Sequence, residues 1–180
     1  MCRPEGAAGT APIVVQPMAA KVIAQRMTAE VDGDFVVFMI GMRINKPWKV
    51  WSWWPVFRAM RPMLKELAAN PQLGCLGYTR GWPVIVQYWR SFDQLESYAK
   101  AAGHLHLPAW RHFNQTIGRS RGDVGIWHET FHVQAGAYET VYSGMPPFGL
   151  GKVGRLVTAT GKRETARQRL LPTGERVTSP

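Results

Sequence analysis

The chain contains few cysteines and no long apolar run. Cys2 and Cys75 are its only thiols, which argues against a disulfide framework and against a metal site made of cysteine alone. The longest uninterrupted apolar run, Phe35 to Met42, has eight residues, whereas a transmembrane helix needs about 20. The N-terminal stretch is only mildly apolar and is broken by Pro12 and Pro17, so it makes a poor secretory signal. We therefore expect a cytoplasmic protein with no transmembrane segment.

Acidic residues are scarce as well. The chain has 12 acidic and 22 basic residues, which gives a net charge of +10. Residues 152–180 hold seven of the basic residues and two of the acidic ones, so they account for half of that charge. Because this segment is also rich in threonine and glycine, a solvated extension explains its charge better than a nucleic-acid interface does. We expect no nucleic-acid partner, and no closely spaced cluster of His, Cys and carboxylates indicates a metal site.

A hydrophobic content of 46% is enough to build the core of one domain. Residues 1–30 are poor in aromatics and contain many Ala, Gly and Pro, so they are expected to form a leader that can be flexible. Residues 31–151 are expected to form the domain, and residues 152–180 a basic tail.

Apolar patterning within the domain predicts four strands and three helices. Ser91 is a suitable N-cap for the second helix, and Pro108 suits the first turn of the third. A run at 138–142 is a candidate extension of the last strand beyond a bend at Gly136. The predicted strands cover 35–43, 73–79, 83–89 and 124–133, and the predicted helices cover 48–70, 91–103 and a short segment that begins near 108.

The order β-α-β-β-α-β is typical of a ferredoxin-like sandwich, an α+β fold with four antiparallel strands and helices on one sheet face. Alternate positions of the first strand are apolar on both sides, with Phe35 and Val37 on one and Val36 and Phe38 on the other. Both sheet faces should therefore be buried. A second copy of the sheet is the simplest cover, so we expect a homodimer with the two sheets facing each other.

Five segments of the chain, in order, resemble a known protein family. The segments read FMIGMRINKPWKVWSWWPVFRAM, VQYWRSFDQLESYA, HLPAWRHFN, GDVGIWHET and AYETVYSGMPPFGLG. The resemblance covers roughly Val31 to Gly151 and leaves out both ends of the chain. The family that these segments resemble is one of unknown function, typified by the fungal monooxygenase of fumagillin biosynthesis.

This resemblance implies a dimeric α+β barrel, related to the antibiotic-biosynthesis monooxygenases. The wider superfamily includes cofactor-independent oxygenases, haem-degrading enzymes, haem-dependent aldoxime dehydratases and decyclising isomerases, so the fold alone does not select a reaction. The leading expectation is a monooxygenase-like enzyme of secondary metabolism that acts on a hydrophobic metabolite without flavin or metal. The alternatives are a haem enzyme of the dehydratase or haem-degrading type, and a non-catalytic module that binds an apolar ligand.

An oxygenase without flavin or metal needs a base and a dry pocket, because its substrate must be deprotonated before it can reduce oxygen. His106, Trp110 and Asn114 recur at i, i+4 and i+8, which predicts one shared helical face. His106 is the preferred base, since an imidazole can accept a proton near neutral pH. His128 is the second candidate, and Asn114 could orient a carbonyl or a peroxide. Each also has a structural interpretation, as a capping or hydrogen-bonded residue, that the sequence leaves open.

The remaining candidates are aromatic and basic side chains that could line a substrate pocket. Arg43 could hold an anionic group or pair with Glu129, and the tryptophans near residue 51 could form a lid, a dimer contact or an interfacial membrane anchor. If haem were bound, it would be non-covalent, with His106 or His128 as axial ligand. The candidate substrate-binding residues are Arg43, Trp51, Trp54, Tyr88, Trp89, Trp110, Trp127 and Tyr142.

Overall fold

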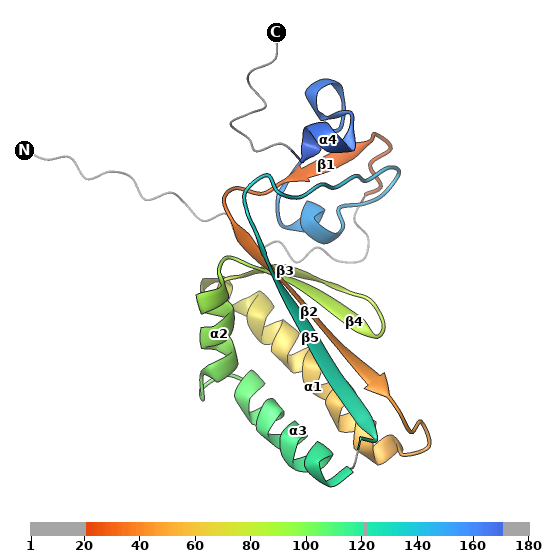
Figure 1. Cartoon of the computed structure of the whole chain (residues 1–180), viewed down its shortest axis with the longest axis vertical. Helices are drawn as coiled ribbons and strands as arrows, with labels where there is room; N and C mark the ends of the chain where they lie inside the picture. The colour runs from red at the N-terminus through yellow and green to blue at the C-terminus, as the bar shows by residue number, and fades with distance from the viewer. Residues whose placement is uncertain (1–20, 121, 171–180) are drawn as a thin grey trace, which may run out of the picture.

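A four-stranded antiparallel sheet forms the middle of the molecule (Figure 1). The computed structural model describes residues 21–120 and 122–170. The sheet has the order β3-β4-β2-β5. Its first strand in sequence, β2, therefore lies between β4 and β5. The strands are β2 (Phe35–Ile44), β3 (Cys75–Arg80), β4 (Val84–Trp89) and β5 (Val124–Val133).

Three helices lie together on one side of this sheet (Figure 1). They are α1 (Val50–Ala69), α2 (Phe92–Lys100) and α3 (His106–Ser120). Ser91 caps α2 as predicted, since its hydroxyl accepts a hydrogen bond from the backbone N–H of Gln94 at 3.2 Å. α3 begins two residues before Pro108 and is longer than the short helix that the sequence predicts.

The α+β class, with antiparallel strands and helices on one face, is confirmed. The prediction that residues 138–142 extend β5 is wrong. A turn closed by Ala137 N–H and the carbonyl of Gln134 ends the strand pairing, at 2.9 Å. Beyond it Tyr142 pairs instead with Met27, through two backbone hydrogen bonds of 2.8 and 2.9 Å.

A second, two-stranded sheet joins the two ends of the described chain. β1 (Met27–Glu30) pairs antiparallel with β6 (Arg155–Thr158), so the predicted leader and the predicted basic tail meet in one sheet. Four-residue strands give too weak a periodicity to be read from sequence. Residues 1–20 and 171–180 of the predicted leader and tail lie outside the described residues.

Three of the seven basic residues of the predicted tail form ion pairs in the small layer, which consists of β1, β6 and the chain that follows β6. Arg155 and Arg163 both form ion pairs with Glu30, at 2.9 and 2.6 Å. Arg169 is buried in the short helix α4 (Ala166–Arg169), and its guanidinium binds the carboxylate of Glu139. Arginines paired in this way hold the segment to the domain.

The two faces of the main sheet carry separate apolar cores, as the apolar residues on both sides of β2 predict. Val36 belongs to the core under the helices, with Trp89, Leu67 and Leu95. Phe35 belongs to the core on the opposite face, which is covered by the small layer. That cover is incomplete, since Trp127 and Phe131 on the same face as Phe35 are 36% and 48% exposed.

Candidate functional site

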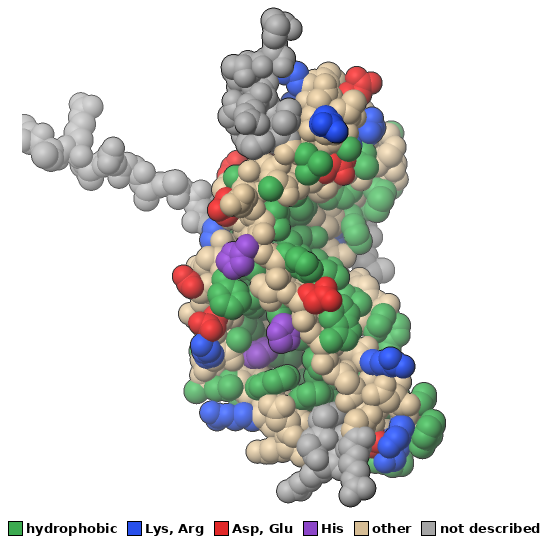
Figure 2. Space-filling model, in the orientation of Figure 1, with side chains coloured by type: hydrophobic (Ala, Val, Ile, Leu, Met, Phe, Trp, Pro, Cys, Tyr) green, Lys and Arg blue, Asp and Glu red, His purple; other side chains and the backbone are tan. Residues whose placement is uncertain are grey.

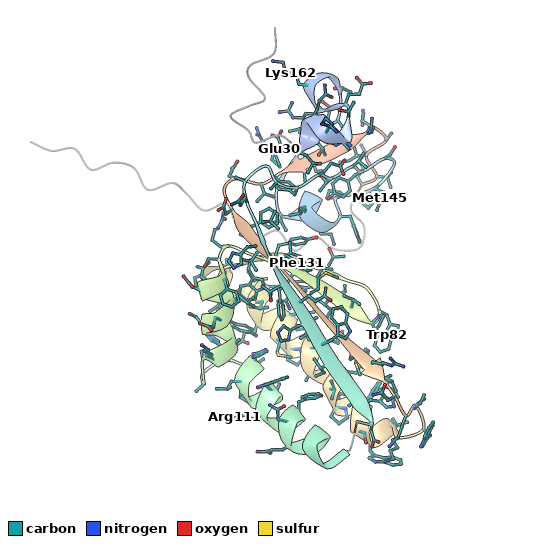
Figure 3. All side chains as sticks on the ribbon, in the orientation of Figure 1. Glu30, Trp82, Arg111, Phe131, Met145 and Lys162 are labelled. Carbon is teal, nitrogen blue, oxygen red and sulfur yellow. The ribbon has the colours of Figure 1, made fainter. Side chains whose placement is uncertain are left out.

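A cavity of about 280 Å³ lies between the three helices and the sheet. Phe38 and His128 contribute to its sheet wall, Met63 to its α1 wall, and His106 and Trp110 to its α3 wall. Figure 2 shows histidine side chains beside a hollow in the face between the helices and β5. In Figure 3 the helices and the main sheet that bound it lie below the small layer. The lining is apolar with a few polar groups, as is usual for small-molecule sites.

His106 is held in one orientation at the start of α3. Its Nδ1 lies 3.0 Å from the carbonyl oxygen of Ala99, and its ring centroid lies 6.0 Å from that of Tyr98. A carbonyl can only accept a hydrogen bond, so Nδ1 must donate, and the neutral ring then carries its free lone pair on Nε2. His106 can therefore accept a proton through Nε2 without losing its bond to Ala99.

His128 approaches the cavity from the sheet. It lies opposite Ile40 in the pairing of β2 with β5 and therefore shares the helix-facing side of the sheet. Its ring centroid is 5.5 Å from that of Phe38. The two candidate histidines thus lie on different walls of one cavity, where one can act as base and the other can donate to a developing oxyanion.

Trp89 forms the floor of the cavity. Its side chain is fully buried, and its Nε1 donates a hydrogen bond to Oε1 of the buried Gln87 at 2.9 Å. The ring also packs against Tyr98, with centroids 5.8 Å apart. A buried indole with its N–H satisfied fixes the shape of the floor and adds no unpaired polar group to it.

Glu66 of α1 positions the segment that carries His106, a role that was not predicted from the sequence. Its carboxylate accepts hydrogen bonds from the Tyr98 hydroxyl at 2.9 Å and from Leu105 N–H at 3.1 Å. Nδ1 of His104 lies 3.1 Å from the same group. Glu66 thus ties α1 to the end of α2 and to the loop before α3. A glutamate inside the apolar stripe of a predicted helix is the signal that could have identified it.

Burial alone would raise the pKa of Glu66, but the hydrogen bonds from Tyr98, Leu105 and His104 together lower it below its ordinary value of 4.5. A lowered pKa means that the ionised carboxylate stabilises the fold above about pH 4.5, and that this stability is lost as the pH falls through the folded-state pKa. We expect Glu66→Gln to lower the free energy of unfolding by about 2 kcal/mol at pH 7, because charged hydrogen bonds are lost.

Urea denaturation at pH 7 and pH 3.5 measures this effect. The difference in stability between wild type and Glu66→Gln should shrink at the lower pH. Glu96→Gln is the matched control, since Glu96 makes an exposed ion pair with Lys100 and should change stability by less than about 0.5 kcal/mol. A difference that is equally large at both pH values would contradict this role of Glu66.

Asn114 does not join His106 and Trp110 at the cavity. With 3.6 residues per turn, a residue at i+8 is rotated by about 80° around the helix, whereas one at i+7 is rotated by only about 20°. Phe113, at i+7, lines the cavity, and its ring stacks on Trp110 with centroids 5.6 Å apart. Asn114 is exposed.

Strand alternation separates several other candidates from the cavity. Tyr88 and Trp127 are each adjacent in sequence to residues that line the cavity. Because successive strand residues alternate between faces, both point to the opposite face of the sheet, where Trp127 covers Gly41. Burial and its neighbour Tyr142 raise the pKa of Tyr88 to about 12, so it stays neutral there. The candidates outside the cavity are Arg43, Trp51, Trp54, Tyr88, Asn114, Trp127 and Tyr142, and those inside are Trp89, His106, Trp110 and His128.

The predicted pairing of Arg43 with Glu129 is absent. Both residues lie on the same sheet face, but Glu129 lies opposite Met39 in the pairing of β2 with β5. Arg43 is therefore four residues away along the strand, a distance of about 13 Å. Arg43 has no ion pair among the described residues.

Comparison with known proteins identifies the family of this chain. The family described as Monooxygenase af470-like matches residues 35–150. The chain belongs to this family. It is 30% identical over 159 residues to the curated Monooxygenase af470 of Aspergillus fumigatus, an alignment that covers 74% of this chain and 55% of that protein. The af470-like chain thus spans about half the length of that relative.

Two solved structures of aldoxime dehydratases share the fold of the af470-like chain. One, determined in complex with butyraldoxime, superposes with a TM-score of 0.59 at 16% identity and covers 75% of this chain and 43% of its own. The other has a TM-score of 0.58 at 17% identity, with coverage of 78% and 45%. At such low identity these likenesses concern the fold alone.

Two further observations concern membrane-spanning helices and groups of metal ligands. No helix in the described part of the chain is long and apolar enough to cross a membrane. Within residues 21–120 and 122–170, no three His, Cys, Asp or Glu side chains are grouped as metal ligands.

Proposed function

We propose that this chain is a small-molecule monooxygenase that oxidises a hydrophobic metabolite in the cavity between the helices and the sheet. The observation that carries the proposal is the placement of His106 and His128 on two walls of one apolar cavity, in a chain of a monooxygenase family. His106 accepts a proton from the substrate through Nε2, and His128 donates a hydrogen bond to the resulting anion.

The substrate must supply the electrons if neither flavin nor metal takes part. In the balanced reaction, a CH₂ group next to an anion-stabilising system reacts with O₂ and gives a carbonyl group and water. His106 removes the first proton, and the carbanion that forms transfers electrons to oxygen. An apolar cavity favours this step because it keeps water away from the anion and from reduced oxygen. Oxygen uptake by the purified protein with apolar, enolisable or phenolic compounds tests the proposal.

Haem is the alternative cofactor. The fold that this chain shares with two aldoxime dehydratases supports this alternative. His106 fits the role of holding such a group: its Nδ1 is bonded to a backbone carbonyl, which is the arrangement that orients Nε2 of metal-binding histidines. A bound haem would supply redox or Lewis-acid chemistry, and His106 would hold it. Titration with haem, followed by absorption, decides the matter: the oxygenase proposal predicts no Soret shift that depends on His106. A shift lost in His106→Ala would favour the haem enzyme instead.

We propose further that the main sheet belongs to a ferredoxin-like unit and that a second copy covers its open face, as in a dimeric α+β barrel. The strand order β3-β4-β2-β5 supports the first part. The exposed Trp127 and Phe131 support the second, because large apolar side chains left open on a sheet face favour association, although Glu129 lies between them on the same face.

Light scattering after size exclusion should therefore give the mass of a dimer for wild type and of a monomer for Phe131→Asp. A charge in an apolar interface is costly to bury. Leu105→Asp, at an exposed position in the loop before α3, is the control and should remain dimeric. A monomeric wild type would rule the dimer out.

A further inference from the structure

A second, larger cavity of about 430 Å³ adjoins the first one. It lies between the middle of α1 and the β3–β4 hairpin, with Trp82 at the tip of that hairpin (Figure 3). The two cavities have four lining residues in common, Ile40, Val56, Met60 and Ile126. The two cavities therefore lie side by side along the helix-facing side of the sheet, and we refer to both together as the channel.

Two arginines line the outer part of this channel. Arg61 follows Phe57 by one turn of α1, and Arg80 lies at the end of β3, opposite Ile85 on the helix-facing side. Both are exposed, and neither has an ion pair among the described residues. The rest of the lining there is apolar and includes the edge-to-face pair of Phe57 and Trp82, with centroids 5.3 Å apart.

Two guanidinium groups without ion-pair partners among the described residues, at the mouth of an apolar channel, favour a ligand that has an apolar part and an anionic part. The outer part of the channel favours an apolar body, because apart from the two arginines its lining side chains are apolar. The mouth favours a carboxylate, which a guanidinium binds through two parallel hydrogen bonds. The net charge of +10 attracts such anions from solution.

We propose that the channel takes an elongated apolar carboxylate, with its carboxylate on Arg61 and Arg80 and its apolar body reaching the cavity of His106 and His128. This inference rests on the proposed function and names the class of substrate for the same site. The carboxylate end stays at the mouth, and the carbon that reacts lies in the part of the molecule farthest from it.

Calorimetric titration with decanoate and with 1-decanol, in the absence of any oxidation, tests the inference. The two probes have the same chain and differ in the charged end. Wild type should bind decanoate about tenfold more tightly than decanol, because only the carboxylate makes charged hydrogen bonds. Arg61→Gln and Arg80→Gln should each reduce this preference, and the double variant should abolish it. Arg58→Gln, an exposed arginine of α1 that lines neither cavity, is the matched control and should keep it.

Equal affinity of wild type for the two probes would overturn the inference, as would a preference that survives in the double variant. Failure of wild type to bind either probe would overturn it as well. The arginines are exposed, so their variants should fold, and circular dichroism checks that they do. The titration needs no turnover, so a carboxylate preference without oxygen uptake would count against the oxygenase chemistry and not against the binding site.

Discussion

His106→Ala is expected to lower the turnover of oxygen by about 100-fold to 10,000-fold, the range by which a positioned general base accelerates proton transfer. The variant removes an imidazole that is fixed by a backbone carbonyl and lines the cavity. Its effect should fall mainly on kcat, because the apolar walls that bind the substrate remain. Steady-state oxygen uptake, measured with an electrode, gives both constants.

His132→Ala is the matched control for this variant. His132 lies on the same strand and the same sheet face as His128 and is exposed like it, but it lines neither cavity. Oxygen uptake by this control should stay within about twofold of wild type. If His106→Ala retained wild-type turnover, another group would have to be the base.

Trp89→Ala is expected to lower the free energy of unfolding by about 3–5 kcal/mol, the cost of removing a large aromatic side chain from a packed core. Trp89 is fully buried between α2 and the sheet, with Leu67 and Leu95 in the same core. The substitution leaves a void and also removes the donor that satisfies Gln87. Urea denaturation measured by circular dichroism gives the loss.

Trp110→Ala provides the comparison, because Trp110 is 42% exposed at the cavity edge. Its loss of stability should be less than half of that for Trp89→Ala. Trp89→Phe should fall between the two, since the ring still fills part of the space. Equal losses for Trp89→Ala and Trp110→Ala would show that Trp89 does not close the core.

The main elements could be predicted because each has a strong local pattern. β2 is a continuous apolar run, and α1 has an apolar stripe over many turns. β1 and β6 could not be predicted, since each has four residues and is stabilised by pairing with a strand more than a hundred residues away. Charge alone suggested a solvated tail, while the acidic partners Glu30 and Glu139 are remote in sequence.

The site could be predicted only in part, for a geometric reason. A helix face is determined by local spacing, so the sequence correctly placed His106 and Trp110 on one face. Asn114 does not share that face, because a residue at i+8 is rotated by about 80° around the helix. The contribution of α1 to the cavity, through Met63 and neighbouring residues, depends on how the helix packs and has no local signal. The same is true of Glu66, whose partners come from α2 and the following loop.

Incorporation of ¹⁸O tests the central claim most directly. Haem-free and flavin-free protein, treated with a chelator, would be incubated under ¹⁸O₂ with apolar carboxylates that carry an enolisable or phenolic group. Mass spectrometry at early times, before exchange with water, would detect the label. The proposed function predicts one ¹⁸O atom in the product and a loss of labelling in His106→Ala. Oxygen consumption without label in any product, or labelling that requires added haem or flavin, would contradict it.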